Sequence, residues 1–152
     1  MTLGDIASAV GKGLFAGAAG TAAMTVSSTI EAKLRGRASS SAPSAAAGKV
    51  LGVQPRNPAG QARFSSVVHW SYGTSWGALR GLLGAAGLGG ATATAAHFTV
   101  VWGSAQVMLP ALEVAPPAWK SDPKEIGIDA FHHVVYVVAT GLAFSALEMN
   151  SS

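Results

Sequence analysis

The amino-acid sequence predicts an all-α fold, an integral membrane four-helix bundle with short loops, and three observations support this prediction. Asp, Glu, Lys and Arg make up only 11% of the 152 residues, against roughly 25% in soluble domains. Hydrophobic residues make up 49% of the chain. Four runs contain no charged residue, at positions 13–30, 64–79, 81–112 and 130–147. About 20 mostly apolar residues are needed to cross a bilayer, so each run, or part of it, can supply one span.

We expect a single domain, residues 1–152, with four spans. The second run is short, but Arg63 and Arg80 flank it, and their long side chains can reach the headgroups and extend its usable length. The third run contains a turn, GLGG at 87–90, and the helix after this turn should end near Pro110. The mean hydropathy of +0.38 is modest, and a soluble alanine-rich bundle is the alternative. The predicted spans are residues 10–31, 61–84, 90–110 and 124–147.

The distribution of Lys and Arg predicts the orientation. Six lie in the first loop and two in the third, against two on the opposite side, Lys12 and Arg80. The positive-inside rule therefore places loops one and three in the cytoplasm and both termini outside. Because the basic residues flank the predicted spans, they explain the sequence pI near 9.6 without a nucleic-acid partner. The expected partners are the lipid bilayer and other membrane protein subunits.

The two cytoplasmic loops differ in character. The first is rich in Ser, Ala and Pro, and residues 43–51 either form a short helix on the membrane surface or belong to a flexible linker. The third is stiffened by four prolines, and Trp119 is expected at the level of the headgroups. The chain has no cysteine, which excludes disulfides and thiolate chemistry.

Small residues recur at helical spacing on the first two spans. Such stripes let helix backbones approach closely, since packing drives helix association in lipid. We favour packing within the bundle over homodimerisation, because four spans must first contact one another. The predicted packing residues are Gly13, Gly17 and Gly20 on the first span and Gly73, Gly77 and Gly81 on the second.

Polar side chains gather in the cytoplasmic half of the predicted bundle. His69 lies six residues beyond Arg63, or about 9 Å along a helix. Asp129 and His133 are spaced to lie on one face of the fourth span, where the carboxylate could accept a hydrogen bond from the imidazole. His97 is placed nearer the opposite surface. The predicted cluster comprises His69, Tyr72, Gln106, Asp129, His132, His133 and Tyr136.

Four interpretations of this cluster stay open. The favoured one is structural, with hydrogen bonds between helices. A second is a proton or ion pathway that uses Asp129 and the histidines. A third is non-covalent haem b, held by His69 and one of His132 or His133. A fourth, an enzyme acting on lipid, has no support from GxSxG, HExxH, GxxxxGK or DxDxDG, which are all missing. We therefore predict no catalytic residues, no metal site and no obligatory cofactor.

Several segments together resemble a known family. GLFAGAAGTAAM lies in the first span, VHWSYGTSWGALRGLLG in the second, MLPALEVAPPAW at the end of the third, and FHHVVY in the fourth. This combination resembles the YagU-like family of small bacterial inner-membrane proteins. The resemblance covers residues 13–147, except that the alanine-rich first loop departs from it. It implies a multi-span helical protein of a bacterial plasma (inner) membrane and supplies no catalytic residues. We expect a non-enzymatic accessory or scaffold subunit, with a small proton, ion or solute carrier as the alternative.

Overall fold

The computed structural model describes residues 2–38 and 40–150, and within them every regular element is helical. The all-α prediction is therefore confirmed. A single turn of 3-10 helix, Ala118–Lys120, interrupts the loop before the last helix. The α-helices are α1 Leu3–Leu34, α2 Ala42–Leu51, α3 Pro58–Ala85, α4 Gly90–Ala111 and α5 Pro123–Met149.

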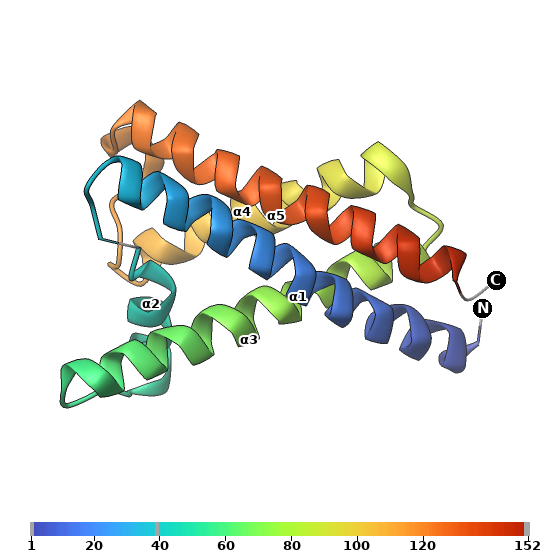
Figure 1. The fold of residues 1–152 in the computed structure, drawn as a ribbon, viewed down its shortest axis with the longest axis horizontal. Helices are drawn as coiled ribbons and strands as arrows, with labels where there is room; N and C mark the ends of the chain where they lie inside the picture. The colour runs from blue at the N-terminus through green and yellow to red at the C-terminus, as the bar shows by residue number, and fades with distance from the viewer. Residues whose placement is uncertain (1, 39, 151–152) are drawn as a thin grey trace.

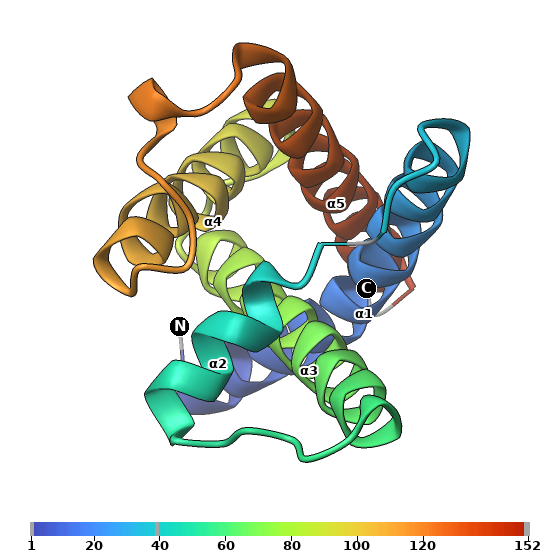
Figure 2. The ribbon, with the colours of Figure 1, turned by 90° about the vertical axis from the view of Figure 1, so that its left-hand side faces the viewer.

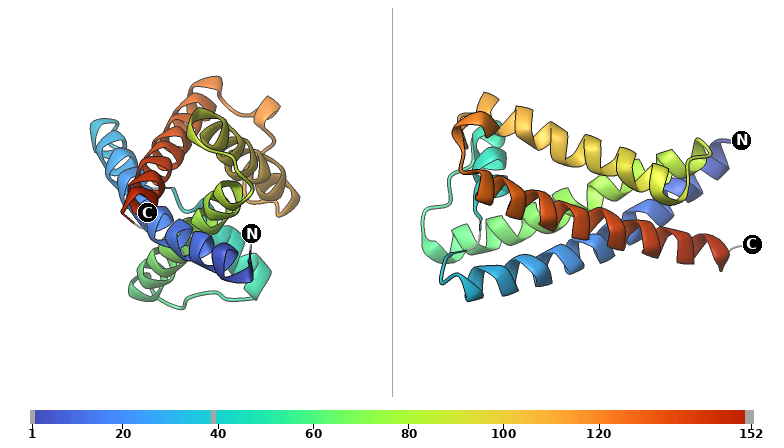
Figure 3. Two further views of the ribbon diagram at one scale, coloured as in Figure 1. Left: turned by 90° about the vertical axis from the view of Figure 1, so that its right-hand side faces the viewer. Right: turned by 90° about the horizontal axis from the view of Figure 1, so that it is seen from above.

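The four long helices alternate in direction (Figure 1). Both ends of the chain lie at one end of the bundle, together with the turn between α3 and α4. The α1–α3 connection, the α4–α5 connection and α2 lie at the opposite end, which we call the loop end (Figures 1 and 2). The view from above in Figure 3 shows the same division. α1 has the most extensive contacts, and they are with α3 and α5.

Side-chain caps and glycines set the helix boundaries. Thr2 and Asp5 form a reciprocal capping box at the start of α1. Asn57 accepts a hydrogen bond from the Gly60 amide at the start of α3, and a proline follows it in the first turn. The predicted turn after α3 uses Gly87 at a φ of 83°, a left-handed conformation that favours glycine.

The prediction that Pro110 ends the third long helix needs a small correction. α4 continues through Pro110 and ends at Ala111. Proline removes the hydrogen bond that its own amide would donate, but its carbonyl can still accept one. The amide of Glu113 donates to the Pro110 carbonyl at 2.9 Å, so the helix closes with one further turn of chain.

The interface between α1 and α3 is made by glycines from both helices. A Cβ atom added at Gly17 would lie 2.6 Å from the Thr74 carbonyl oxygen and 2.8 Å from the Gly77 Cα. A Cβ at Gly77 would meet the carbonyl oxygen of Gly13. The two backbones are thus in direct contact, which only glycine allows at these positions. The stripes lie inside the bundle, in agreement with the favoured prediction.

A second close approach joins α1 to α5. A Cβ at Gly20 would lie 2.8 Å from the Tyr136 carbonyl oxygen and would also meet the Thr140 hydroxyl. Gly20 is therefore directed at a different helix from Gly13 and Gly17, because its place on the helical wheel differs from theirs. As a result α1 contacts two neighbours through separate small-residue surfaces.

The short helix α2 settles the open question about the first loop in favour of a helix. Ser44 is buried and accepts a hydrogen bond from the Ser65 hydroxyl of α3 at 2.9 Å. The Lys49 ammonium donates to the Leu112 carbonyl oxygen at 2.6 Å, which ties α2 to the third loop. Trp119, expected at the headgroups, has a side chain that is 83% exposed.

Length and hydropathy single out one helix among the described residues, Pro123–Met149, as apolar enough to cross a membrane. Glycine, serine, threonine and polar aromatic residues together form a larger share of the other three long helices, which lowers their mean hydropathy.

Candidate functional site between α1 and α5

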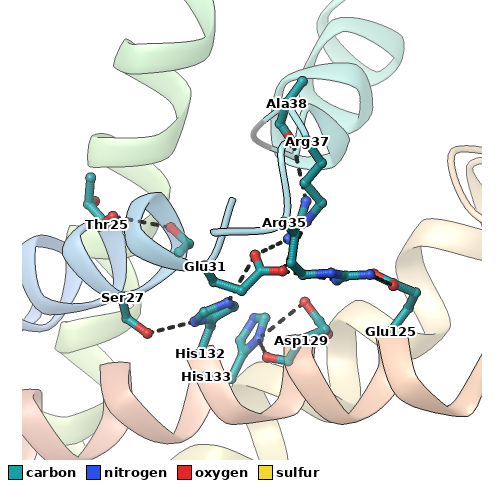
Figure 4. Close-up of polar contacts among 11 residues, drawn as sticks. Thr25, Ser27, Glu31, Arg35, Arg37, Ala38, Glu125, Asp129, His132 and His133 are labelled. Atoms are coloured by element: carbon teal, nitrogen blue, oxygen red, sulfur yellow. Dashed lines mark hydrogen bonds and ion pairs between the residues drawn. The ribbon is translucent and has the colours of Figure 1, made fainter. Parts of the chain in front are cut away.

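The densest polar cluster of the described residues lies at the loop end, where α1 ends and α5 begins (Figure 4). Glu31 of α1 accepts hydrogen bonds from Arg35 at 2.9 Å and from the Nε atom of Arg37 at 3.1 Å. Arg35 also donates to Glu125 of α5 at 3.1 Å. Hydrogen bonds to Glu125 and Glu31 raise the pKa of the Arg35 guanidinium above its ordinary value, so the network stays ionised.

His132 of α5 extends this network toward the middle of the bundle. Its Nδ1 atom is 2.7 Å from the Ser27 hydroxyl of α1. Its Nε2 atom is buried without a hydrogen-bond partner among the described residues, and the Glu31 Oε2 atom lies 3.7 Å from it. The neutral tautomer with its proton on Nε2 would direct an N–H donor toward Glu31, whereas the other tautomer places a lone pair there.

A groove between the two helices opens beside this cluster. Its volume is about 550 Å³, and its wall is almost entirely apolar. The residues that line it are Ser27, Ile30, Glu31, Leu34 and Arg35 of α1 and Lys124, Gly127, Ile128, Phe131 and His132 of α5.

Asp129 differs from the prediction in its main partner. Its carboxylate accepts a hydrogen bond from the indole nitrogen of Trp102 on α4, at 2.9 Å. The Nδ1 atom of His133 donates to the backbone carbonyl of Asp129 at 2.8 Å and lies 3.5 Å from the carboxylate. The carboxylate thus joins α4 to α5, and the backbone carbonyl is the closer acceptor for His133. The sequence contains a signal for this pair, because Trp102 and Asp129 lie at similar depths on the two helices that the third loop connects.

Two of the other predicted polar residues, His69 and Tyr136, make polar contacts across a helix interface. His69 is 2.8 Å from the Thr25 hydroxyl of α1. Tyr136 donates to the Gly73 carbonyl of α3 at 2.6 Å. Tyr72 packs edge-on against a tryptophan of its own helix and is 36% exposed, and Gln106 is half-buried on α4.

The predicted cluster is therefore spread over several helix pairs. His69 and His132 contact Thr25 and Ser27, which are two residues apart on α1 and so point to different faces. To bind a haem iron through Nε2, His69 would have to lose its hydrogen bond with the Thr25 hydroxyl. Within residues 2–38 and 40–150 no three His, Asp or Glu side chains come together as a metal site requires.

Sequence reasoning misplaced one residue, Arg80. It was expected to extend outward to the headgroups, but its side chain turns inward, is only 2% exposed and stacks on the ring of Phe144 at 4.3 Å. Its Nε and Nη1 atoms are buried without hydrogen-bond partners among the described residues. The cation–π contact offsets part of the cost of burial. Nearby, the buried His97 ring donates from Nε2 to the Trp76 carbonyl at 3.0 Å, on the level predicted for it.

Comparison of the chain with known protein families, with curated proteins and with solved structures finds no match. The resemblance to the YagU-like family thus rests on the motifs described above.

The Glu31 network gives a first testable prediction. Glu31→Gln should raise the rate of amide hydrogen exchange at residues 35–38 about tenfold or more, since Arg35 and Arg37 lose their shared charged acceptor. Glu113→Gln is the matched control, because the Glu113 side chain is 90% exposed and lies 3.8 Å from Lys49. Equal exchange in both variants would show that Glu31 does not order this segment.

Proposed function

We propose that this chain is a four-helix integral membrane protein and that it acts as a non-enzymatic accessory subunit packed against a larger membrane protein complex. The main support is the spacing of its charges. α1 has no charged residue between Lys12 and Glu31, a rise of about 28 Å. The gap from Asp129 to Glu148 on α5 is as long, and α4 carries no charge at all. These lengths agree with a hydrocarbon core of about 30 Å.

Exposure along the helices supports the same setting. Large apolar side chains face outward in the charge-free part of every long helix. Phe15 of α1 is 76% exposed, Val67 of α3 66%, Val107 of α4 72% and Leu142 of α5 70%. Water would disfavour such a surface on all sides of a small bundle, whereas lipid solvates it well.

The low hydropathy of α1, α3 and α4 has a structural explanation in this setting. Gly17 and Gly77 make the contact between the two helix backbones. The hydroxyls of Thr21 and Thr25 donate hydrogen bonds to carbonyls of their own helix. Such residues lower mean hydropathy without leaving unsatisfied polar groups in lipid. The positive-inside rule then favours a cytoplasmic position for the loop end in a bacterial plasma membrane.

The accessory role is supported by how the interior polar groups are used. Tyr136, His69 and Asp129 each hydrogen-bond to a neighbouring helix, which is what a structural bundle requires. The extramembrane segments are short, so the protein has little surface for chemistry outside the bilayer. The apolar outer faces of the helices are the surfaces it offers to a partner subunit.

Extraction of the tagged protein from its native membrane in a mild detergent tests this role. A native gel and mass spectrometry on the same sample should show migration in a large complex with other integral membrane proteins. A particle of one chain alone, recovered across several mild detergents, would contradict the accessory role while leaving membrane insertion intact.

One observation favours a small carrier as the second candidate. The Asp129 side chain is 47% exposed even though it accepts a hydrogen bond from Trp102. An exposed carboxylate within a proposed span is a common element of proton and ion pathways.

Asp129→Asn separates the two candidates. For an accessory subunit, we expect the variant to insert, to assemble and to leave proton and ion flux in proteoliposomes unchanged, because the amide can still accept the Trp102 hydrogen bond. For a carrier, the wild type should show flux that the variant loses. Glu113→Gln serves as the control that removes an exposed carboxylate outside the spans.

A further inference from the structure

The groove between α1 and α5 has two chemically different ends. Ile30 and Leu34 of α1 face Ile128 and Phe131 of α5 along its wall. Three of these side chains are more than half exposed, Ile30 at 54%, Leu34 at 83% and Phe131 at 58%. The mouth of the groove, nearest the loop end, contains cationic side chains. The groove therefore suits a molecule with an apolar body and an anionic head.

The two ends are separated along the helix axes by a distance that fits a lipid. Phe131 lies seven residues beyond Lys124 on α5, or about 10 Å deeper. If Lys124 lies at the headgroups, Phe131 contacts the upper part of an acyl chain. A polar, water-soluble ligand would gain little by contacting this open apolar wall.

Charge at the mouth favours an anionic head. Arg35 and Arg37 both pair with Glu31, and Arg35 also pairs with Glu125. Among the described residues, the ammonium of Lys124 forms no hydrogen bond or ion pair, and the same holds for Lys33. Asp122, beside Lys124, is engaged with the amide at the start of α5. Lys33 and Lys124 therefore carry positive charges that no carboxylate within residues 2–38 and 40–150 pairs with, and Lys124 lines the groove itself.

We propose that this groove binds one anionic phospholipid, with its phosphate against Lys124 and Arg35 and an acyl chain along Ile128 and Phe131. The proposal rests on the membrane placement given under the proposed function. Basic recesses between helices at the cytoplasmic surface are suited to anionic headgroups, because both charge and hydrocarbon are satisfied together. Bound lipid would also cover apolar side chains beside the Glu31 network and so stabilise the junction of α1 with α5.

Native mass spectrometry of the purified protein in mild detergent tests this proposal, with dioleoyl phosphatidylglycerol or dioleoyl phosphatidylcholine added at equal concentration. The wild type should retain one phosphatidylglycerol in preference to phosphatidylcholine. Lys124→Gln should lower that preference about fivefold, the effect of one lysine near a lipid phosphate. Lys120→Gln makes the same change of charge at the same end, does not line the groove, and should leave the preference unchanged.

A second variant separates the acyl contact from the headgroup contact. Phe131→Ala should weaken retention of both lipids by a similar factor, because the ring contacts the chain and not the phosphate. Equal effects of Lys124→Gln and Lys120→Gln would overturn the proposal, as would a wild type without preference. Displacement of the lipid by soluble glycerol phosphate would identify a site for free phosphate esters instead, and dimers lost in Phe131→Ala would identify a second copy as the occupant.

Flotation with pure phosphatidylcholine vesicles measures membrane insertion separately from lipid preference, so it tests the proposed function independently of the lipid site. Failure of the wild type to insert would overturn the membrane placement itself. Stable insertion combined with no phosphatidylglycerol preference would overturn only the lipid site.

Discussion

Gly77→Ala should destabilise the bundle by about 2–3 kcal/mol, because the added methyl group has nowhere to go. Its Cβ would lie 2.6 Å from the Gly17 Cα and 2.8 Å from the Gly17 amide nitrogen, and it would also meet the Gly13 carbonyl oxygen. All three are backbone atoms, so the strain cannot be relieved by a side-chain rotation. The two helices would have to separate along their contact. Unfolding in mixed micelles of increasing denaturing detergent measures the change.

Gly103→Ala is the matched control for this substitution. Gly103 also lies inside a long helix, but a Cβ there meets nothing within 4 Å. The alanine should be neutral or should stabilise the protein by about 0.5–1 kcal/mol through its better helix propensity. Equal losses in the two variants would mean that backbone contact between α1 and α3 does not limit stability.

Phe144→Ala should have an effect of similar or greater size, about 3 kcal/mol. The Phe144 ring is fully buried, at 0% exposure, and the Arg80 guanidinium lies 4.3 Å from its centroid. Removing the ring leaves a cavity between α3 and α5 and deprives a buried cation of its aromatic partner. The loss should appear in the same unfolding measurement as a lower midpoint.

Phe15→Ala makes the same chemical change on the outer surface, where the ring is 76% exposed. In lipid this ring contacts acyl chains in the folded and unfolded forms alike, so we expect a change below 1 kcal/mol. A loss as large as that of Phe144→Ala would show that Phe15 is covered in the folded protein, for example by a partner subunit.

The sequence predicts the long helices well because their determinants are local. Each determinant affects only the few residues around it. These determinants are the charge-free runs, the prolines at positions 58 and 123 and the glycine turn at 87. The class of the contact between α1 and α3 was also predictable, since GxxxG spacing requires a close neighbour. Which neighbour each glycine meets depends on the crossing of three helices, and Gly20 shows that the spacing alone does not identify it.

The candidate site was only partly predictable. Depth along a helix placed Asp129, His132 and His133 at one level, but their partners depend on rotation about the helix axis. Sequence spacing within α5 suggested Asp129 for His133, whereas Trp102 of α4 bonds the carboxylate. Gly84 has no side chain and so leaves room for the Phe144 ring and the inward-turned Arg80 guanidinium, a property of two helices that no single segment encodes.

The central position of α1 has a consequence for biosynthesis. α1 is the first helix to be made, yet its two principal neighbours, α3 and α5, follow it in the chain, and α5 comes last. In a membrane, the α1–α3 pair can form as soon as residue 85 has emerged, whereas the surface of α1 around Gly20 and Ser27 waits for α5. A truncated chain ending before Pro123 would present that surface to lipid or to insertion factors. In the proposed membrane placement, newly made protein is therefore most exposed to quality control in the interval between insertion of α4 and docking of α5.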